Sequence, residues 1–451
     1  MKVVIIGSGK VGRSLIKYLS NENHDITIID NNKEALEMAT NVFDIQGILA
    51  NGTIKKVQTE AGVPKADMVI AVTDKDELNM VCCATAKSLG AKCTIARVRD
   101  TDYMSDYEFL KETLNIDYIV NPEQSAAEEV YNILRFPSAL KVHSFEKGKV
   151  IAVELLVPED CIICGLALKD LDKKFSEKVI ISSVLREEEV VIPDGEFVLQ
   201  AGDRINVIAN PARLRTFFKE ADIFNKRAKN VLIIGGSRIS FYLSKLLVED
   251  GIRVKIIEKT EKRCKELLET LDKVEIIHAD GAHKHVLDEE NISSYDACIG
   301  LTNLDEQNIV ISLYAKSKLV DTVISKVSTQ TFIEILDDID LNTYISPKEV
   351  VANQIVLYSR SLRATTEQSP VSLYKTLDDK AELLEYNVGE DEEFVGKTIN
   401  QLKLKDDIIV ASIIRKGQVV IPSGEEVLCE KDSIIVSTTG KVIKKVEDIL
   451  K

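Results

Sequence analysis

The stretch Lys2-Val-Val-Ile-Ile-Gly-Ser-Gly-Lys-Val-Gly12 decides the fold of the first part of the chain. The β-branched residues Val3–Ile6 predict a buried strand, and the glycine-rich turn that follows opens onto the helical pattern of Val11–Leu19. A GxGxxG match alone is a weak signal, because it arises often by chance. Its place between a strand and a helix strengthens it, and Asp30 ends the next predicted strand. This order predicts a dinucleotide-binding βαβ unit.

Each residue of the motif has an expected role in that geometry. Gly7 permits the tight turn, Gly9 lets the backbone approach a pyrophosphate, and Gly12 lets the helix pack closely on the strand. Free N–H groups and the positive end of the helix dipole attract the phosphates. Asp30 is placed to bind both ribose hydroxyls and to repel a 2′-phosphate, which favours NAD(H) over its phosphorylated form. A glycine-rich turn that serves packing alone is the alternative.

The same residues also have the spacing of a P-loop, with Arg13-Ser14 where Lys-Ser or Lys-Thr is required. Arginine is bulkier than lysine and does not reproduce its contact with the β- and γ-phosphates. No Mg²⁺-binding aspartate can be assigned to a neighbouring strand. We therefore do not expect phosphate hydrolysis.

Further candidates follow the other predicted strands, because ligands of such sheets bind at the carboxyl ends of the strands. A hydroxyl at Thr73 suits a ribose or phosphate, and Arg97 offers the positive charge that a diphosphate attracts. Asn79 has two equally weighted interpretations, a polar contact at a helix start or a ligand group. The candidates expected in the first site are Gly7, Ser8, Gly9, Lys10, Val11, Gly12, Asp30, Asn51, Gly52, Thr73, Asp74 and Arg97.

The pattern occurs twice along the chain. Lys2–Gly7 corresponds to Asn230–Gly235, and Val72–Asn79 corresponds to Leu301–Asn308. The register continues into the turns, where Val191-Ile-Pro-Asp-Gly195 corresponds to Val420-Ile-Pro-Ser-Gly424. Convergent core patterning would not hold a register over that distance, so we infer a duplicated unit of about 225 residues.

The glycine-rich turn Gly7–Gly12 and its counterpart Gly235–Ser240 are called the first and second phosphate loops below. The second has diverged from the first. Serine replaces two glycines, so Ser237 should obstruct the approach of a pyrophosphate and Ser240 should loosen the packing of helix on strand. Lys326 stands where the first unit has Arg97. The expected binding residues of this weaker site are Gly235, Gly236, Ser237, Arg238, Ile239, Glu258, Asp280 and Thr302.

Each unit divides into two parts. Short strands that alternate with helices predict a parallel sheet, and the strands and turns beyond Pro137 predict a small α+β module. The expected fold class is α/β, with two Rossmann-like, doubly wound parallel-sheet domains, each followed by a small α+β domain. The expected boundaries are 1–136, 137–225, 226–350 and 351–451, with a charged linker at 219–229.

Composition limits the class of protein. The 451 residues carry a net charge of −15, which argues against a nucleic-acid binder, and the absence of tryptophan argues against a base-stacking platform. Because the first strand starts at once, we expect no secretion signal and a cytoplasmic location. The eight cysteines form no repeated framework, and we interpret the Cys161/Cys164 pair as ordinary buried thiols.

The sequence lacks the groups that a dehydrogenase needs. None of the five histidines pairs with a suitable Arg/Asp set, and the small modules are too short for a usual substrate domain. His283-Lys-His285 with Asp280 has spacing open to a metal, but a solvated turn is the preferred interpretation. A dinucleotide site without catalytic groups indicates a sensor, not an enzyme.

The ordered motifs resemble the regulator-of-potassium-conductance (RCK) domain family. The resemblance is carried by Gly7–Gly12, Asp30, Asn51-Gly52, Val72–Asn79, Ile95-Ala-Arg97 and Asn121-Pro-Glu123, with Pro193-Asp-Gly195 and Ala201-Gly-Asp203 matching the family's C-terminal domain. The tandem arrangement over the whole chain is similar to cytosolic regulatory subunits of Trk potassium uptake systems.

That resemblance implies a protein that binds NAD(H), and also ATP or ADP, and that gates a TrkH/TrkG-type membrane subunit. It implies a homo-oligomeric ring, usually a tetramer, held on the inner face of the membrane by its partner. Two alternatives stay open: an NAD-dependent oxidoreductase, and a nucleotide-sensing oligomer without a membrane partner.

Overall fold

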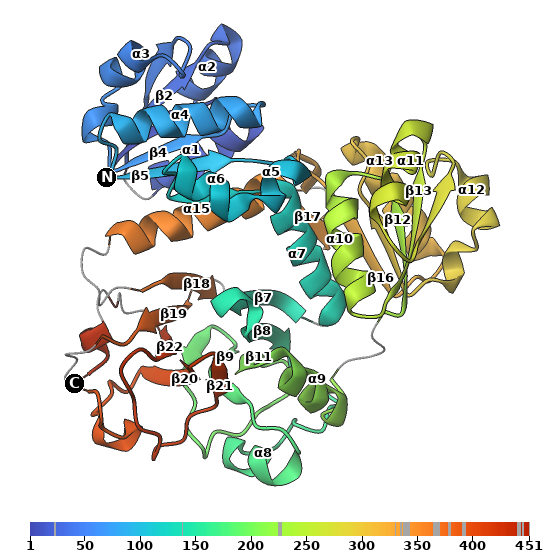
Figure 1. Cartoon of the computed structure of the whole chain (residues 1–451). Helices are drawn as coiled ribbons and strands as arrows, with labels where there is room; N and C mark the ends of the chain where they lie inside the picture. The colour runs from blue at the N-terminus through green and yellow to red at the C-terminus, as the bar shows by residue number, and fades with distance from the viewer. Residues whose placement is uncertain are drawn as a thin grey trace. The chain divides into compact units, whose positions relative to one another are not determined.

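The computed structural model describes most of the chain, in two compact units that each combine segments from both halves of the sequence (Figure 1). Unit 1 is Met1–Tyr131 with Ala228–Val356, and unit 2 is Asn132–Arg227 with Leu357–Lys451. The described residues are 1–21, 24–137, 139–223, 228–329, 331–333, 336, 343–363, 370–377, 380–389, 394–439, 443 and 446–450. The domain boundaries expected from the sequence stay predictions.

Unit 1 holds the two Rossmann-like domains predicted from the sequence. The first has a parallel sheet of order β3-β2-β1-β4-β5-β6, in which the strand order reverses between β1 and β4. Its elements are β1 (Lys2–Ile6), α1 (Lys10–Asn21), β2 (Asp25–Asp30), α2 (Lys33–Thr40), β3 (Gln46–Leu49), α3 (Lys55–Glu60), η1 (Val63–Lys65), β4 (Met68–Ala71), α4 (Asp76–Ser88), β5 (Cys93–Arg97), α5 (Thr101–Ser105), α6 (Tyr107–Thr113), β6 (Tyr118–Val120) and α7 (Pro122–Arg135).

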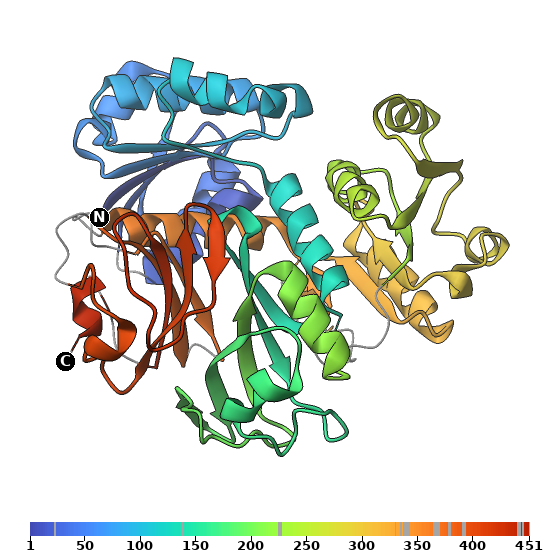
Figure 2. The same cartoon turned by 60° about the horizontal axis from the view of Figure 1, so that its bottom comes forward.

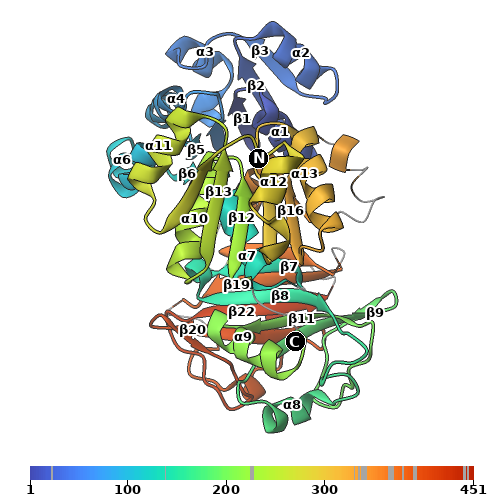
Figure 3. The same ribbon diagram turned by 90° about the vertical axis from the view of Figure 1, so that its right-hand side faces the viewer.

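The second Rossmann-like domain repeats this topology in the order β14-β13-β12-β15-β16-β17. Helices α10 and α11 cover one face of its sheet, and α12 and α13 cover the other (Figure 3). The elements are β12 (Asn230–Ile234), α10 (Arg238–Glu249), β13 (Arg253–Glu258), α11 (Glu261–Thr270), β14 (Val274–His278), α12 (Lys284–Glu289), η3 (Ile292–Ser294), β15 (Ala297–Gly300), α13 (Asp305–Ser317), β16 (Thr322–Lys326), β17 (Tyr344–Ile345) and α15 (Pro347–Arg363).

Unit 2 contains two antiparallel five-stranded sheets with the same strand order, β10-β9-β11-β8-β7 and β21-β20-β22-β19-β18. The first module comprises β7 (Ala139–Phe145), η2 (Glu146–Gly148), β8 (Val150–Leu156), α8 (Leu168–Lys174), β9 (Ile180–Arg186), β10 (Glu189–Val191), β11 (Arg204–Ala209) and α9 (Pro211–Glu220). The second comprises β18 (Ser372–Thr376), β19 (Ala381–Asn387), η4 (Ile399–Gln401), β20 (Ile408–Arg415), β21 (Gln418–Val420), β22 (Ser433–Thr439) and η5 (Val446–Ile449).

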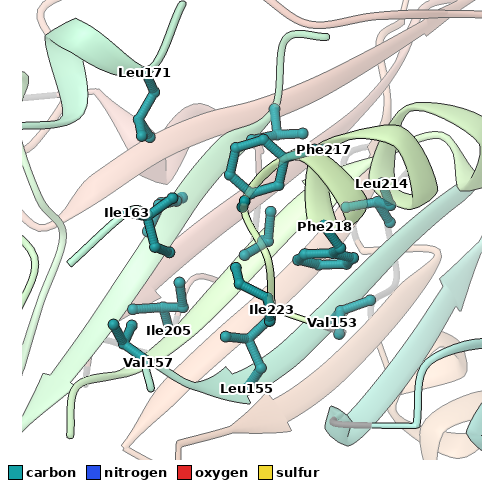
Figure 4. Packing of buried hydrophobic residues seen from close by; sticks show 14 of the residues in the cluster. Val153, Leu155, Val157, Ile163, Leu171, Ile205, Leu214, Phe217, Phe218 and Ile223 are labelled. Carbon is teal, nitrogen blue, oxygen red and sulfur yellow. The ribbon is translucent and has the colours of Figure 1, made fainter. Parts of the chain in front are cut away.

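The first module has apolar contacts on both faces of its sheet. One face packs against α9 and the loops around Ile163, with Phe217 and Phe218 buried in the centre (Figures 2 and 4). Residues from the other face, including Ala152 and Ile208, share a buried cluster with Leu383 and Ile435 of the second module. The two modules therefore form one joint core.

The turn motifs that repeat in the sequence have a structural role in these modules. Arg186 donates from Nε and Nη2 to the two oxygens of Asp203, both at 2.7 Å. Arg415 makes the same pair with Asp432 at 3.0 and 2.9 Å. Each aspartate is 1% exposed, so these bidentate ion pairs fix the turn before the last strand of the module.

A buried carboxylate joins the two modules. Glu154 on β8 is fully buried, pairs with Arg204, and accepts bonds from Oγ1 of Thr376 at 2.6 Å and from the N–H of Leu377 at 3.1 Å. Burial raises the pKa of this carboxyl group, but the bonds from Thr376, Arg204 and Leu377 outweigh that effect and hold the pKa below its ordinary value. Its contribution to stability is therefore present at neutral pH and is lost as the pH falls through the folded pKa.

We predict that Glu154→Gln lowers the stability of unit 2 by about 3 kcal/mol at pH 7, because it leaves the Arg204 charge without its buried partner. Urea unfolding of the full chain, followed by circular dichroism, measures the change. Glu385→Gln is the matched control, because Glu385 is its counterpart on β19 and accepts bonds from the hydroxyls of Ser372 and Ser433. We expect a loss of about 1 kcal/mol there. Equal losses, or a Glu154→Gln effect that persists undiminished at acid pH, would contradict the assignment.

In the described part of the chain, no helix combines the length and the apolar character that a membrane span requires.

Candidate functional site

The first phosphate loop connects β1 to α1 at the carboxyl edge of the sheet. Gly7 has a φ of +109°, in the region that favours glycine. The first backbone bond of α1 runs from the N–H of Arg13 to the carbonyl of Gly9 at 3.0 Å. The N–H groups of Lys10, Val11 and Gly12 therefore lie outside the helical ladder, where a phosphate can accept them.

The three glycines of this loop meet different surroundings. A Cβ at Gly12 would lie 2.0 Å from the carbonyl oxygen of Gly7, whereas a Cβ at Gly9 would meet nothing within 4 Å. Gly12 is thus required for the approach of α1 to β1. Gly9 borders open space, as expected for a residue that a ligand approaches.

Asp30 is held beside this loop by backbone groups on both sides. Its Oδ2 accepts the N–H of Ser8 at 2.5 Å and the Ser8 hydroxyl at 2.7 Å, and its Oδ1 accepts the N–H of Asn32 at 2.8 Å. A carboxylate has about four lone-pair positions, so capacity remains for a ribose hydroxyl.

After β4, Thr73 makes hydrogen bonds to the protein itself, besides the ligand role expected of it. Thr73 donates its hydroxyl and its N–H to Oδ1 of Asn79, at 2.7 and 2.8 Å. The Asn79 amide donates back to the carbonyls of Thr73 and Arg97, at 3.2 and 2.9 Å. Asn79 is fully buried. Its two open interpretations are therefore resolved in favour of a structural contact, which ties the ends of β4 and β5 together.

Of the remaining candidates of the first site, some are buried in the loops and others are exposed to solvent. Oδ1 of Asn51 accepts the N–H and hydroxyl of Thr53, and Gly52 is packed so tightly that a Cβ would lie 2.3 Å from Ile6. Asp74 is exposed, and its carbonyl accepts a bond from Arg99. Ser8 is fully buried, and Val11 is buried as well. Asp74 and Asn51 thus lie at the rim of the loop, exposed to solvent.

The second site reproduces most of this frame. Glu258 accepts the N–H of Gly236 at 2.6 Å and that of Thr260 at 2.7 Å, as Asp30 does in the first domain. Thr302 and Asn308 repeat the Thr73 and Asn79 network, with Asn308 donating to the carbonyl of Lys326 at 2.9 Å. Asp280 accepts the N–H of Ala282, in the turn that corresponds to Asn51.

The second phosphate loop differs where the sequence differs. Gly235 keeps a φ of +103°, but Ser237 caps α10 with its hydroxyl, which accepts the N–H of Ser240 at 3.3 Å. One amide that is free in the first loop is therefore occupied here, while the N–H groups of Arg238 and Ile239 stay outside the ladder.

Ser240, which we expect to loosen the packing of α10 on β12, makes a polar contact with the loop before the helix. Ser240 is fully buried, and its hydroxyl donates to the carbonyl of Gly235 at 2.5 Å. The Ser240 hydroxyl forms a hydrogen bond with the carbonyl that corresponds to that of Gly7. A polar contact therefore stands where the first domain has the close contact of Gly12.

The two phosphate loops belong to the same compact unit, and helices of one domain contact those of the other. Nδ2 of Asn121, just before α7, donates to the Tyr242 hydroxyl of α10 at 3.1 Å, and α7 lies beside α10 (Figure 1). Ser125 of α7 donates to Gln354 of α15 at 3.0 Å. These bonds join the start of α7 to α10 and to the middle of α15.

Five basic side chains near the loops have no carboxylate partner among the described residues: Lys10, Arg97, Arg238, Lys326 and Lys348. Burial lowers the pKa of Arg97, and Arg99 and Arg238 lower it further. Burial also lowers the pKa of Lys326 and of Lys348, and the positive charge of Lys10 lowers both further. Nε of Arg97 and Oε2 of Glu123 are buried without a hydrogen-bond partner. Basic side chains that form no ion pair fit an anionic ligand.

Sequence reasoning did not identify Lys348 or Glu123 as candidate residues. Both follow a proline at the start of a helix, in Asn121-Pro-Glu123 and Ser346-Pro-Lys348. The repeated X-Pro-X pattern is the signal that would have shown that the two positions correspond.

Other candidate chemistry receives no support. All eight cysteines are free thiols, and six of them are buried. Burial raises the pKa of Cys161. The rings of His283 and His285 stack at 5.6 Å, and within the described ranges no group of three or more His, Cys, Asp or Glu side chains is arranged to hold a metal ion.

Comparison with known proteins identifies the family. Residues 3–122 and 231–347 match the TrkA-N domain, and residues 152–222 and 383–451 match the TrkA-C domain. The chain belongs to the TrkA family. A Trk system potassium uptake protein TrkA homolog 2 from Methanosarcina mazei is 30% identical over 459 residues, with 100% of both chains covered. The Trk system potassium uptake protein TrkA of Haemophilus influenzae is 28% identical, covering 100% of this chain and 98% of the relative.

Solved structures agree with this fold for the TrkA-family chain. The GsuK channel bound to NAD superposes with a TM-score of 0.64 at 17% identity, covering 97% of this chain and 76% of the channel. The GsuK RCK domain gives 0.63 at 17% identity, covering 97% and 92%. The tandem arrangement of Rossmann-like domains and small modules expected from the sequence is confirmed.

We predict different outcomes for alanine at two glycines of the TrkA-N loop. Gly→Ala within a helix ordinarily stabilises by about 1 kcal/mol, but Gly12→Ala should destabilise by about 3 kcal/mol because its Cβ meets the Gly7 carbonyl. Gly9→Ala, the control in open space, should change stability by less than about 1 kcal/mol. Thermal unfolding of both variants measures the difference, and a neutral Gly12→Ala would show that the close approach is not required.

Proposed function

We propose that this chain is the cytosolic regulatory subunit of a Trk-type potassium uptake system, which binds NAD(H), ATP and ADP at its Rossmann-like domains and gates a potassium-translocating membrane subunit of the TrkH/TrkG type. It is not an enzyme in this proposal. It assembles as a homo-oligomeric ring, a tetramer, on the inner face of the membrane. The family, the full-length relatives named for the Trk system, and the GsuK channel bound to NAD support the proposal.

The unpaired basic side chains at the phosphate loops carry the proposal. The chain has a net charge of −15, yet Lys10, Arg97 and Lys326 form no ion pair with a described carboxylate, and the first loop has free N–H groups. Unsatisfied cations that lie partly buried and close together are costly unless an anion joins them. A nucleotide supplies that anion through its phosphates, while Asp30 remains available to its ribose.

Coupling between the two domains follows from the same charges. The positive charge of Lys10 in the first domain lowers the pKa of Lys326 and of Lys348 in the second. The charge of Arg238 in the second domain lowers the pKa of Arg97 in the first. Like charges across the contact repel when no anion is bound, and phosphates reverse that effect. A bound nucleotide therefore favours one docked arrangement of the domains, and this difference in affinity is what shifts a population of ring states.

Gly9→Val tests the first site, because a Cβ there meets no protein atom within 4 Å and the side chain extends into the space that we assign to the ligand. We expect calorimetric titration with NAD(H), ATP or ADP to show loss of the tighter binding event, with a fall in affinity of at least about a hundredfold and unchanged thermal unfolding. Ser237→Asp is the matched variant of the second site, since aspartate keeps the helix cap while its charge repels phosphate. Wild-type binding by Gly9→Val would refute the site.

The membrane partner requires a separate experiment. Co-purification with a Trk-type membrane subunit, together with potassium uptake by cells that carry Gly9→Val, separates a gating subunit from a nucleotide-sensing oligomer without a membrane partner. Native mass spectrometry measures the ring. A substrate-dependent change in the absorbance of the reduced cofactor would instead favour an oxidoreductase.

A further inference from the structure

An arginine of the second domain is bonded directly to the second phosphate loop. Arg263 on α11 donates from Nε to the carbonyl of Gly236 at 2.6 Å and from Nη1 to the carboxylate of Glu266 at 3.0 Å. Glu258 accepts the N–H of the same Gly236, also at 2.6 Å. A basic and an acidic side chain therefore hold the two backbone groups of one loop residue. The guanidinium of Arg263 thus lies close to the carboxylate that we expect to bind the ribose.

The guanidinium of Arg263 has unused donors. In the described part of the chain, Nη2 donates to no acceptor, and the side chain is 30% exposed. The bonds of Nε and Nη1 hold the planar group in place, so little conformational freedom is lost when it forms a further bond. A phosphate accepts bonds from a guanidinium more readily than a neutral hydroxyl does. Arg263 is therefore suited to bind a phosphate group close to the ribose.

The first domain has no arginine at this position. Ala35, the third residue of α2, corresponds to Arg263, the third residue of α11. The side chain of Arg13 reaches α2 from α1, but it contacts Met38, one turn beyond Ala35. Within the described ranges Asp30 accepts hydrogen bonds but forms no ion pair. The ribose end of the first site is therefore acidic, whereas that of the second combines an acid with an arginine.

We propose that Arg263 lets the second site accept a nucleotide with a phosphate on the 2′-hydroxyl of its adenosine ribose, the NADP(H) class, which Asp30 and Ala35 exclude from the first site. In dinucleotide-binding folds an arginine near the ribose accommodates the 2′-phosphate. The two oxygens of Glu258 accept backbone N–H groups, and the charge of Arg263 offsets the charge of this carboxylate. The inference rests on the proposed function, because it concerns the same two nucleotide sites.

The second site is tested in the full-length Gly9→Val variant, in which the first site should no longer bind. Calorimetry there measures the affinities for NAD⁺ and NADP⁺. Adding Arg263→Ala should lower NADP⁺ affinity at least about tenfold and NAD⁺ affinity less than about threefold, because only NADP⁺ has the phosphate that Arg263 binds. Arg263→Lys keeps the charge but not the planar fork, so it should give an intermediate ratio. Adenosine 2′,5′-bisphosphate and AMP, which differ only in the 2′-phosphate, should show the same change.

The reciprocal change tests the first site in the Ser237→Asp background. NADP⁺ should bind there at least about tenfold more weakly than NAD⁺, and Ala35→Arg should raise NADP⁺ affinity about tenfold with little change for NAD⁺. Lys265→Ala is the control on α11, because it removes a charge of the same sign from a side chain that is 68% exposed and pairs with Glu261 at 2.7 Å. It should leave the ratio of the two affinities unchanged.

The possible outcomes are distinct. If Arg263→Ala lowers both affinities equally, or neither, Arg263 only braces the loop and the inference is overturned. A second site that rejects NADP⁺ as strongly as the first would overturn it too, as would an Ala35→Arg variant with no gain for NADP⁺. These results leave nucleotide binding intact, whereas absence of all nucleotide binding by the wild type would overturn the proposed function as well. Thermal unfolding checks that each variant folds, and Arg263→Lys replaces Arg263→Ala if the alanine variant does not.

Discussion

The close approach of α1 to β1 is the contact on which the first site depends. It brings the Gly7 carbonyl so near that Gly12 has no room for a Cβ, and it leaves the first N–H groups of the helix outside the backbone ladder. The loop that makes this approach also bonds Ser8 to Asp30, so the two ends of the proposed nucleotide site are set together. A shift of α1 would disturb both ends, because one short loop carries both.

The second domain shows another way to meet the same constraint. Ser240 supplies a hydroxyl to the Gly235 carbonyl, and Ser237 caps the helix. These bonds keep α10 against β12 without glycine, but the cap occupies an amide that a phosphate would otherwise accept. Duplication thus preserved the frame, including the Thr–Asn network at the strand ends, while local chemistry and charge diverged at the loops.

Unit 2 joins its two modules by a partly polar contact. An apolar cluster with Ala152 and Leu383 supplies the area, and Glu154 adds bonds to Thr376 and Leu377 that an apolar side chain cannot make. A buried carboxylate with satisfied bonds specifies one relative register of the modules, because any other register leaves it unpaired. The Arg–Asp pairs at the turns do the same within each module.

The sequence by itself determined the α/β fold, the duplication and most of the first loop, because strand pattern, glycine spacing and the position of Asp30 are local and act through backbone geometry. It also showed that the second loop differs from the first at Ser237. Only the tertiary structure decided the role of Asn79, whose four bonds reach residues up to 18 positions away, and the accommodation of Ser240. It alone showed that Asn121, just before α7, contacts Tyr242 of the second domain. Contacts between domains depend on which faces pack, and a local pattern does not encode which partner a face will meet.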